Sequence, residues 1–173
     1  MRRFILISIA MVFVIAISFF AHGIVSKTRG KVKIEEQIAR LPSFSFITLE
    51  NASYYSDSIK KGPVLIVRFH PECEHCKFEI SEIMNSKIPA SGIKILLVSG
   101  AGREDVIRFL DQFNITEKQG VMPLLDTAFI FGDIFGKDVV PSNYIYNKEL
   151  KLVKILYGEY KTETILKYLE QGE

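Results

Sequence analysis

The chain has 173 residues, of which 48% are hydrophobic and 24% are charged, and its formal net charge is +2 at pH 7. This length allows one domain with a sizeable core. Two cysteines are too few for a disulfide scaffold, and no basic stripe interleaved with aromatic residues suggests nucleic-acid binding. All 20 acidic residues follow residue 33, whereas six of the 22 lysines and arginines lie within the first 33 residues, so the positive excess belongs to the N-terminal segment.

The N-terminal segment predicts a membrane anchor. Residues 4–21, FILISIAMVFVIAISFFA, contain no charged residue, and the run continues to residue 25 with only one further polar side chain, His22. This length suffices to cross a hydrocarbon core of about 30 Å. Because a cleaved signal usually has a shorter apolar stretch, we expect an uncleaved transmembrane helix over residues 1–25, with a cleaved signal as the alternative. More basic residues follow the run than precede it, so charge counting alone places the body in the cytoplasm.

After a polar tether over residues 26–41, the sequence predicts alternating strands and helices. Short apolar or β-branched runs indicate strands, and apolar side chains every three or four residues indicate amphipathic helices. The expected strands and extended segments cover residues 44–51, 64–69, 93–99, 121–126, 142–147 and 150–158. The expected helices cover residues 74–87, 103–113, 127–135 and 161–171.

The order of these elements predicts the fold class. Alternating strands and helices, followed by a hairpin and a last helix, are typical of an α/β domain with a mixed central β-sheet and helices on both faces. The first strands must be parallel, because right-handed crossover helices connect them. We therefore expect one domain over residues 42–173, preceded by the single N-terminal transmembrane helix and its tether.

Both cysteines lie in FHPECEHC, residues 69–76, at the carboxyl end of the expected strand 64–69. Open α/β sheets place their chemistry at this end of the strands. The free N–H groups and the positive dipole end of the following helix favour a thiolate at Cys73, and His75 can add to this effect as a donor or cation. A second thiol in reach resolves a mixed disulfide. The pattern predicts a redox-active dithiol in which Cys73 attacks and Cys76 resolves.

A metal site and an inert staple are the alternatives for this segment. His70, Cys73, His75 and Cys76 are four potential soft or borderline ligands, which leaves a copper-handling metallochaperone as the alternative function. A closed zinc site usually recruits ligands from a second segment, and there is no third cysteine. A disulfide across so short a loop would add little stability. We therefore expect no bound metal and no cofactor.

Residues 42–171 resemble the thioredoxin-fold superfamily, most closely the membrane-anchored thioredoxin-like and redoxin-domain proteins of bacterial envelopes. The resemblance rests on VLIVRFHPECEHC, on VMPLLD and on VVPSNYIYNKELKLVK. It implies a thioredoxin-like fold in which the Val140–Pro141 bond is cis and faces the dithiol. Val140 and Pro141 would then shape the substrate groove. The implied activity is that of a thiol–disulfide oxidoreductase that reduces or oxidises cysteines of envelope proteins, with the redox direction left open.

The resemblance also bears on location and partners. Relatives with one N-terminal anchor present their domain outside the cytoplasm, so the resemblance implies a single-pass protein of the bacterial inner (cytoplasmic) membrane with its domain on the periplasmic or extracytoplasmic side, against the charge count. The implied partners are cysteine-containing protein substrates and a redox partner protein. We expect a monomer that binds no nucleic acid. A redox-inactive scaffold that keeps the fold for partner binding is a third interpretation.

Overall fold

The structure is a computed structural model that describes residues 34–115 and 120–171, together with residues 11, 17 and 19. Contacts divide the chain into two compact units, residues 1–36 and 37–173. The expected anchor over residues 1–25, except for those three single residues, and residues 26–33 of the expected tether lie outside the described residues. Within the described part of the chain, no helix is both long and apolar enough to span a bilayer.

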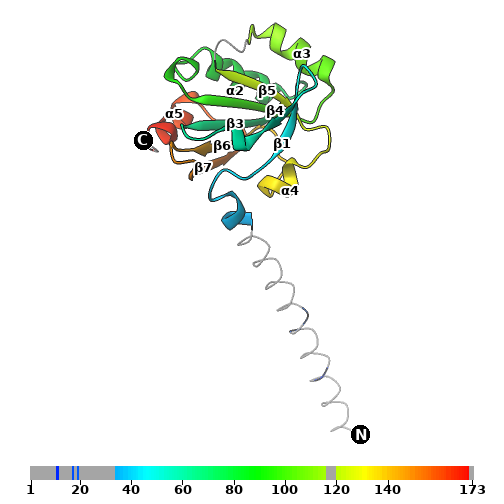
Figure 1. Ribbon diagram of the computed structural model, residues 1–173, viewed down its shortest axis with the longest axis vertical. Helices are drawn as coiled ribbons and strands as arrows, with labels where there is room; N and C mark the ends of the chain where they lie inside the picture. Colours follow the sequence, from blue (N-terminus) through cyan, green and yellow to red (C-terminus); the bar gives the residue numbers. More distant parts are fainter. Residues whose placement is uncertain (1–10, 12–16, 18, 20–33, 116–119, 172–173) are drawn as a thin grey trace. The chain divides into compact units, whose positions relative to one another are not determined.

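The second unit is built on a seven-stranded sheet with the strand order β2-β1-β5-β4-β3-β6-β7. Figure 1 shows its central strands side by side. The strands are β1 (Ser45–Thr48), β2 (Ser53–Tyr55), β3 (Val64–Phe69), β4 (Lys94–Ser99), β5 (Val121–Leu125), β6 (Ser142–Tyr146) and β7 (Leu152–Tyr157). The helices are α2 (Glu74–Met84), α3 (Arg103–Gln112), α4 (Phe131–Phe135) and α5 (Thr162–Gln171), with short 3₁₀ turns at Ser56–Ser58 and Pro89–Ser91.

The sheet is mixed, as the order of elements predicted. β3, β4 and β5 are parallel neighbours, and α2 and α3 connect them in turn. β6 and β7 extend the sheet as an antiparallel pair beside β3, and β1 pairs antiparallel with β5 on the other side. This arrangement makes β3 a central strand, and all six of its residues are buried.

Alternation along β3 divides the interior into two cores. Leu65, Val67 and Phe69 belong to the larger core, to which α2, α3 and α5 contribute apolar side chains. On the opposite face, α4, β6 and β1 with the residue before it supply an aromatic cluster of Phe44, Phe46, Phe131, Phe135 and Tyr144. Helices therefore cover both faces of the sheet, which confirms the predicted α/β domain with a mixed sheet, although α4 on the second face is short.

Three segments differ from the expected elements. The expected strand 44–51 ends at Thr48, whose side-chain oxygen accepts N–H groups of the following turn, and the chain returns as β2. The expected helix 127–135 begins only at Phe131, because Phe129 has a positive φ of 54° and the Asp126 carboxylate accepts the N–H groups of Ile130 and Phe131. Both differences arise from side chains that bind the backbone of a turn.

The third difference concerns residues 37–41 of the expected tether, which pack within the second unit. The side chain of Ile38 is 2% exposed, and its carbonyl accepts a hydrogen bond from the Tyr146 hydroxyl at 3.2 Å. The N–H of Leu41 donates to the carbonyl of Leu150 at 2.8 Å. The packed unit therefore starts before residue 42.

Candidate active site

The two cysteines lie where β3 gives way to α2. Cys73 is the N-cap residue of α2, and its sulfur accepts a hydrogen bond from the backbone N–H of Cys76 at 3.2 Å. Both residues are free thiols; Cys73 is half-buried, whereas Cys76 has no exposed surface. A hydrogen bond from a helix N-terminus favours negative charge on the sulfur that accepts it. The arrangement therefore joins an accessible sulfur at the helix start to a second thiol buried directly behind it.

The buried position of Cys76 determines its protonation. Burial is the main cause that raises the pKa of the Cys76 thiol far above its ordinary value, and the neighbouring Cys73 sulfur raises it further. A thiol of this kind is protonated at neutral pH and becomes a nucleophile only when a nearby group removes its proton. The site consequently needs a proton acceptor close to Cys76.

Glu79 is a functional candidate that the sequence analysis missed. It lies one helical turn after Cys76, and its side chain is fully buried. Its Oε1 accepts hydrogen bonds from Asn143 Nδ2 at 3.0 Å and from the backbone N–H of Tyr160 at 2.9 Å. Burial raises the pKa of Glu79 to about 7, although these two hydrogen bonds act in the opposite direction. The signal in the sequence is an acidic residue within the apolar stripe of α2, beside Cys76, Ile80 and Ile83.

Two buried oxygen atoms without a hydrogen-bond partner, one of them on Glu79, fit a neutral carboxyl group. Within the described part of the chain, Glu79 Oε2 and Asn143 Oδ1 are buried and have no hydrogen-bond partner. Both atoms can only accept while the carboxyl is ionised. A proton on Oε2 turns that atom into a donor. The two unpaired oxygen atoms therefore agree with the raised pKa of Glu79.

His75 lies between the two cysteines in sequence, but its ring contacts Glu159. Its Nδ1 lies 2.7 Å from Glu159 Oε2, and the His75 side chain is 75% exposed. The other histidine of the segment, His70, accepts the N–H of Glu72 through its Nδ1 at 3.2 Å. Among the described residues, no three His, Cys, Asp or Glu side chains are grouped to hold a metal ion. The influence of His75 on the Cys73 thiolate stays a prediction.

The Val140–Pro141 peptide bond is cis, as the resemblance implied. Ser142 pairs with Arg68 across β6 and β3, so Pro141 lies next to the end of β3 from which the cysteine segment leaves. Pro141 is buried, whereas Val140 is 39% exposed. The sheet register thus brings the two predicted substrate-binding residues to the same edge as the dithiol.

Three consecutive residues between β7 and α5 connect the parts of this site. The N–H of Gly158 donates to the carbonyl of Pro141 at 2.9 Å. The carboxylate of Glu159 contacts His75, and the N–H of Tyr160 donates to Glu79. One short segment therefore binds the cis-proline loop, the dipeptide between the cysteines and the buried acid.

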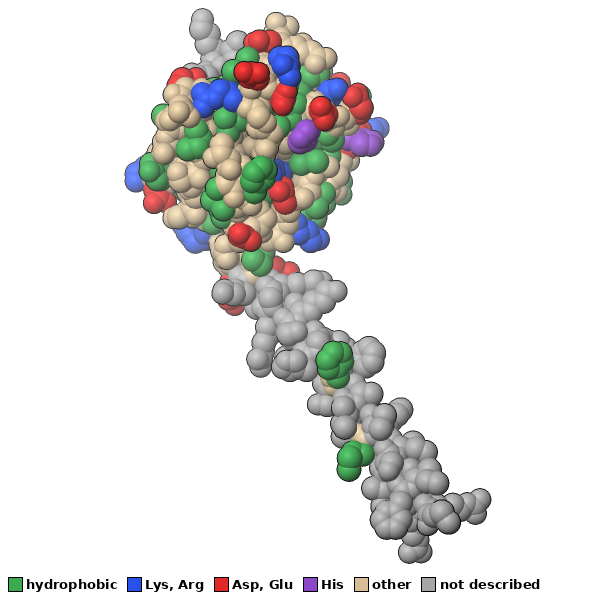
Figure 2. Space-filling model, turned by 90° about the vertical axis from the view of Figure 1, so that its right-hand side faces the viewer, with side chains coloured by type: hydrophobic (Ala, Val, Ile, Leu, Met, Phe, Trp, Pro, Cys, Tyr) green, Lys and Arg blue, Asp and Glu red, His purple; other side chains and the backbone are tan. Residues whose placement is uncertain are grey.

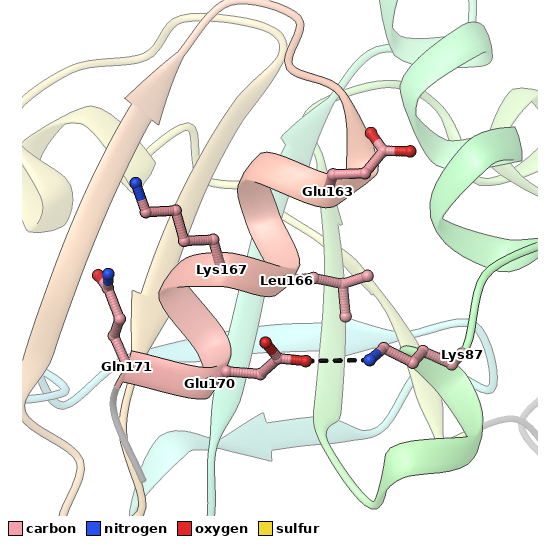
Figure 3. A pocket seen from close by; sticks show the side chains of 6 residues that line it. All are labelled: Lys87, Glu163, Leu166, Lys167, Glu170 and Gln171. Carbon is pink, nitrogen blue, oxygen red and sulfur yellow. Dashed lines mark hydrogen bonds and ion pairs between the residues drawn. The ribbon is translucent and has the colours of Figure 1, made fainter.

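Surface hollows lie near both ends of α2, and neither is lined by a cysteine. A groove of about 490 Å³ beside the N-terminus of α2 is lined by Pro71, Glu72, Glu74, Lys77, Asp105, Arg108, Phe109 and Gln112. The other groove, of about 480 Å³, follows α5; Figure 3 shows Glu170 of that helix paired with Lys87 at 3.0 Å. Lys87 comes after the end of α2, at the far end from Cys73, so this second groove is separate from the dithiol.

The face of the domain drawn in Figure 2 carries acidic, basic and apolar side chains that are interspersed rather than gathered by charge.

Comparison with known proteins identifies the fold. No family model matches the chain, and no curated protein matches its sequence. Among solved structures, MTB dsbF in mixed oxidised and reduced forms matches with a TM-score of 0.67 at 15% identity, over 79% of this chain and 97% of that one. A secreted Mycobacterium tuberculosis disulfide oxidoreductase homologous to E. coli DsbE matches with a TM-score of 0.65 at 13% identity, over 79% and 98%. A thioredoxin-family thiol:disulfide interchange protein from Chlorobium tepidum TLS matches with a TM-score of 0.64 at 18% identity, over 78% and 95%. The domain has a thioredoxin-like fold.

Proposed function

We propose that the protein is a thiol–disulfide oxidoreductase whose redox centre is Cys73-Glu74-His75-Cys76. The observation that carries this proposal is the pairing of a half-buried N-cap sulfur with a fully buried thiol one turn later. The structural neighbours with the same fold include a disulfide oxidoreductase and a thiol:disulfide interchange protein, which supports the same class of reaction.

The reaction begins when the Cys73 thiolate attacks a sulfur of a partner disulfide. A bond forms between Cys73 and that sulfur, and the partner's other sulfur leaves as a thiolate. Cys76 then loses its proton and attacks the Cys73 sulfur. This step forms the Cys73–Cys76 disulfide and releases the partner's second sulfur as a thiolate, so the partner has gained two electrons. The reverse sequence transfers a disulfide to a dithiol partner.

Glu79 is the proton acceptor in the second step. The Cys76 thiol has a pKa well above its ordinary value because of burial, whereas burial brings the pKa of Glu79 to about 7. A carboxyl group with a pKa near the working pH can accept a proton and later return it. Its place one turn along the same buried helix face, close enough to influence the charge on Cys76, suits it to this role.

The partner binds at the edge formed by the cysteine segment and the cis-proline loop. Val140 offers exposed apolar surface there, and Pro141 fixes the start of β6. An extended segment of a cysteine-containing protein could bind this edge through its backbone, with Val140 in contact with its side chains. A redox partner protein would restore the dithiol or the disulfide after each cycle.

We also propose that the domain is held at the extracytoplasmic side of the bacterial inner membrane. The support is the uncharged run over residues 4–21 and the resemblance to anchored envelope proteins. Cells that express the protein would be fractionated, and spheroplasts would be treated with protease. Membrane association and digestion from outside are the expected results; a protected or cytosolic domain would contradict this placement.

The decisive experiment for the reaction compares Cys73→Ser with Cys76→Ser. Cys76→Ser should accumulate mixed disulfides with partner proteins or glutathione, because its attacking sulfur remains while the resolving thiol is gone. Cys73→Ser should accumulate few. Non-reducing gels and mass spectrometry measure the adducts. If wild-type protein exchanges no disulfides and neither variant traps a partner, the proposed function is wrong.

Two further measurements separate the remaining alternatives. The reduction potential of the Cys73–Cys76 pair indicates the direction of electron transfer. A value of about −270 mV indicates a reductant, and one of about −120 mV indicates an oxidant. Metal analysis of the reduced protein tests the copper-handling alternative. Stoichiometric copper that is lost in Cys73→Ser would favour that alternative.

A further inference from the structure

A charged residue interrupts the apolar strand that leads to the dithiol. Arg68 lies in the sequence VLIVRF of β3 and is only 4% exposed. Its guanidinium lies 4.9 Å from the centre of the Phe131 ring, on the face of the sheet opposite the larger core. A buried charge is costly unless other charges and hydrogen bonds compensate it. The contacts that compensate the charge of Arg68 therefore indicate the role of this residue.

Arg68 is held between two carboxylates, and the stronger contact is with Asp138. Arg68 Nε donates to Asp138 Oδ1 at 2.6 Å, and Nη2 donates to Oδ2 at 2.9 Å. Such a fork of two parallel bonds fixes orientation as well as charge. Asp126 lies 3.5 Å from Nη1, but its oxygens already accept the N–H groups of Ile130 and Phe131. The directional bonds of Arg68 thus go to Asp138.

The close fit around the guanidinium supports this assignment. Gly100 follows β4 next to Arg68, and a β-carbon placed there would lie 3.1 Å from Arg68 Nη2. The Phe129 ring is also close to that position, at 3.3 Å. The backbone of Gly100 needs no positive φ, so the requirement for glycine here is one of space for the guanidinium.

Asp138 directly precedes the exposed loop that reaches the cis-proline. Val139 and Val140 are 40% and 39% exposed, and in the described part of the chain no hydrogen bond holds either residue. Beyond them, the Pro141 carbonyl accepts the N–H of Gly158 at 2.9 Å. The two valines are therefore held from their ends, by Asp138 on one side and by Pro141 on the other.

We propose that Arg68 is a positioning residue for substrate binding, which holds the Val139–Val140 rim beside Cys73 through its fork to Asp138. This inference rests on the proposed function, because the rim is the surface to which the partner's extended segment binds. Arg68 acts through the loop and not through the sulfur atoms, since its side chain lies on the face of the sheet opposite α2. Loss of the fork should weaken substrate binding and leave the chemistry of the dithiol unchanged.

The test uses Asp138→Asn in the full-length protein. The Asp138 side chain is 40% exposed, so this substitution does not leave a carboxylate buried in the core without its partner. The matched control is Asp133→Asn, an exposed acid five residues earlier in α4. The substrate is a peptide that contains one disulfide. We expect KM for the peptide to rise roughly tenfold in Asp138→Asn, with kcat and the Cys73–Cys76 reduction potential unchanged. Arg68→Lys keeps the charge but loses the fork, so its KM should lie between those of wild type and Asp138→Asn.

Backbone NMR order parameters from nitrogen-15 relaxation provide a readout that does not depend on activity. The order parameters of residues 137–140 should be lower in Asp138→Asn than in wild type, and unchanged in Asp133→Asn. An unchanged KM, unchanged order parameters or a shifted reduction potential in Asp138→Asn would each overturn the proposal. If wild-type protein reduces and oxidises no disulfide at all, the proposed function fails, while the order parameters still decide whether the fork holds the loop.

Discussion

The backbone N–H of Tyr160 donates a hydrogen bond to Glu79 Oε1 at 2.9 Å, which joins the buried face of α2 to the segment before α5. Asn143 of β6 donates to the same oxygen at 3.0 Å. Glu79 is consequently the one described acid that contacts both the cis-proline strand and the segment that binds His75. Its protonation should affect both the stability of the domain and the exchange reaction.

Glu79→Gln should change how stability depends on pH. The folded-state pKa of Glu79 is about 7, against 4.5 for a glutamate that water surrounds. Between these values the unfolded chain has lost the proton while the folded chain keeps it, so the free energy of unfolding falls as pH rises from about 4.5 to 7. The loss amounts to about 3 kcal/mol above pH 7. Glutamine mimics the neutral acid and should remove this loss.

Chemical denaturation between pH 4 and pH 8 measures the effect. Glu79→Gln should be more stable than wild type at pH 8 and equal to it near pH 4. Glu82→Gln is the control, because Glu82 is exposed on the same helix. Equal pH slopes for wild type and Glu79→Gln would show that the buried carboxyl does not titrate in this range.

The same variant should slow the resolving step. Since Glu79 accepts the proton of Cys76, release of the partner from the mixed disulfide should become faster in wild type as pH rises through about 7. Glu79→Gln should lose this inflection and release the partner on the order of 10²-fold more slowly at neutral pH. Stopped-flow measurement of a preformed mixed disulfide separates this step from the attack by Cys73, whose rate should not change. An unaltered pH profile would exclude Glu79 as the acceptor.

Replacement of His75 should make the dithiol more reducing. The predicted role of His75 is to favour the Cys73 thiolate from the dipeptide between the cysteines, so its loss should lower the reduction potential of the pair. The His75 side chain is 75% exposed and bound to Glu159, so solvent weakens the effect, and we expect a shift on the order of 10–30 mV for His75→Ala. Equilibration with glutathione buffers measures it. Lys87→Ala removes a cation at the far end of α2 and should leave the potential unchanged. A rise after His75→Ala would reverse the role predicted for this residue.

Gly158→Ala should destabilise the domain by about 1–2 kcal/mol, because Gly158 has a φ of 92° that a residue with a β-carbon adopts with strain. No atom lies within 4 Å of the added β-carbon, so the cost is one of backbone conformation. Gly132→Ala is the matched control, since Gly132 is helical and its added β-carbon would make only ordinary contact with Asp138. Thermal unfolding compares the two. Equal melting temperatures for Gly158→Ala and wild type would show that the segment relaxes to accept alanine.

The sequence by itself determined the central strand β3, the helix that follows the cysteines and the resulting placement of Cys73 and Cys76. These features depend on local order: an apolar run, a helical period of apolar residues and the two-residue spacing of the cysteines. The turn between β1 and β2 and the late start of α4 were not predicted, because side chains of Thr48 and Asp126 bind nearby backbone groups there. Apolar periodicity carries no information on such bonds.

Only the tertiary structure decided which polar side chains meet. Glu79 and Tyr160 are 81 residues apart, Arg68 and Asp138 are 70 apart, and His75 and Glu159 are 84 apart. Each contact depends on the register of β6 against β3 and on the return of the chain from β7 into α5. A carboxyl group on the apolar stripe of a helix acquires a raised pKa only when packing excludes water from it. A charged residue in an apolar strand is stabilised only when a residue of another loop pairs with it. Both conditions concern burial and distance in space, which the order of residues along the chain does not contain.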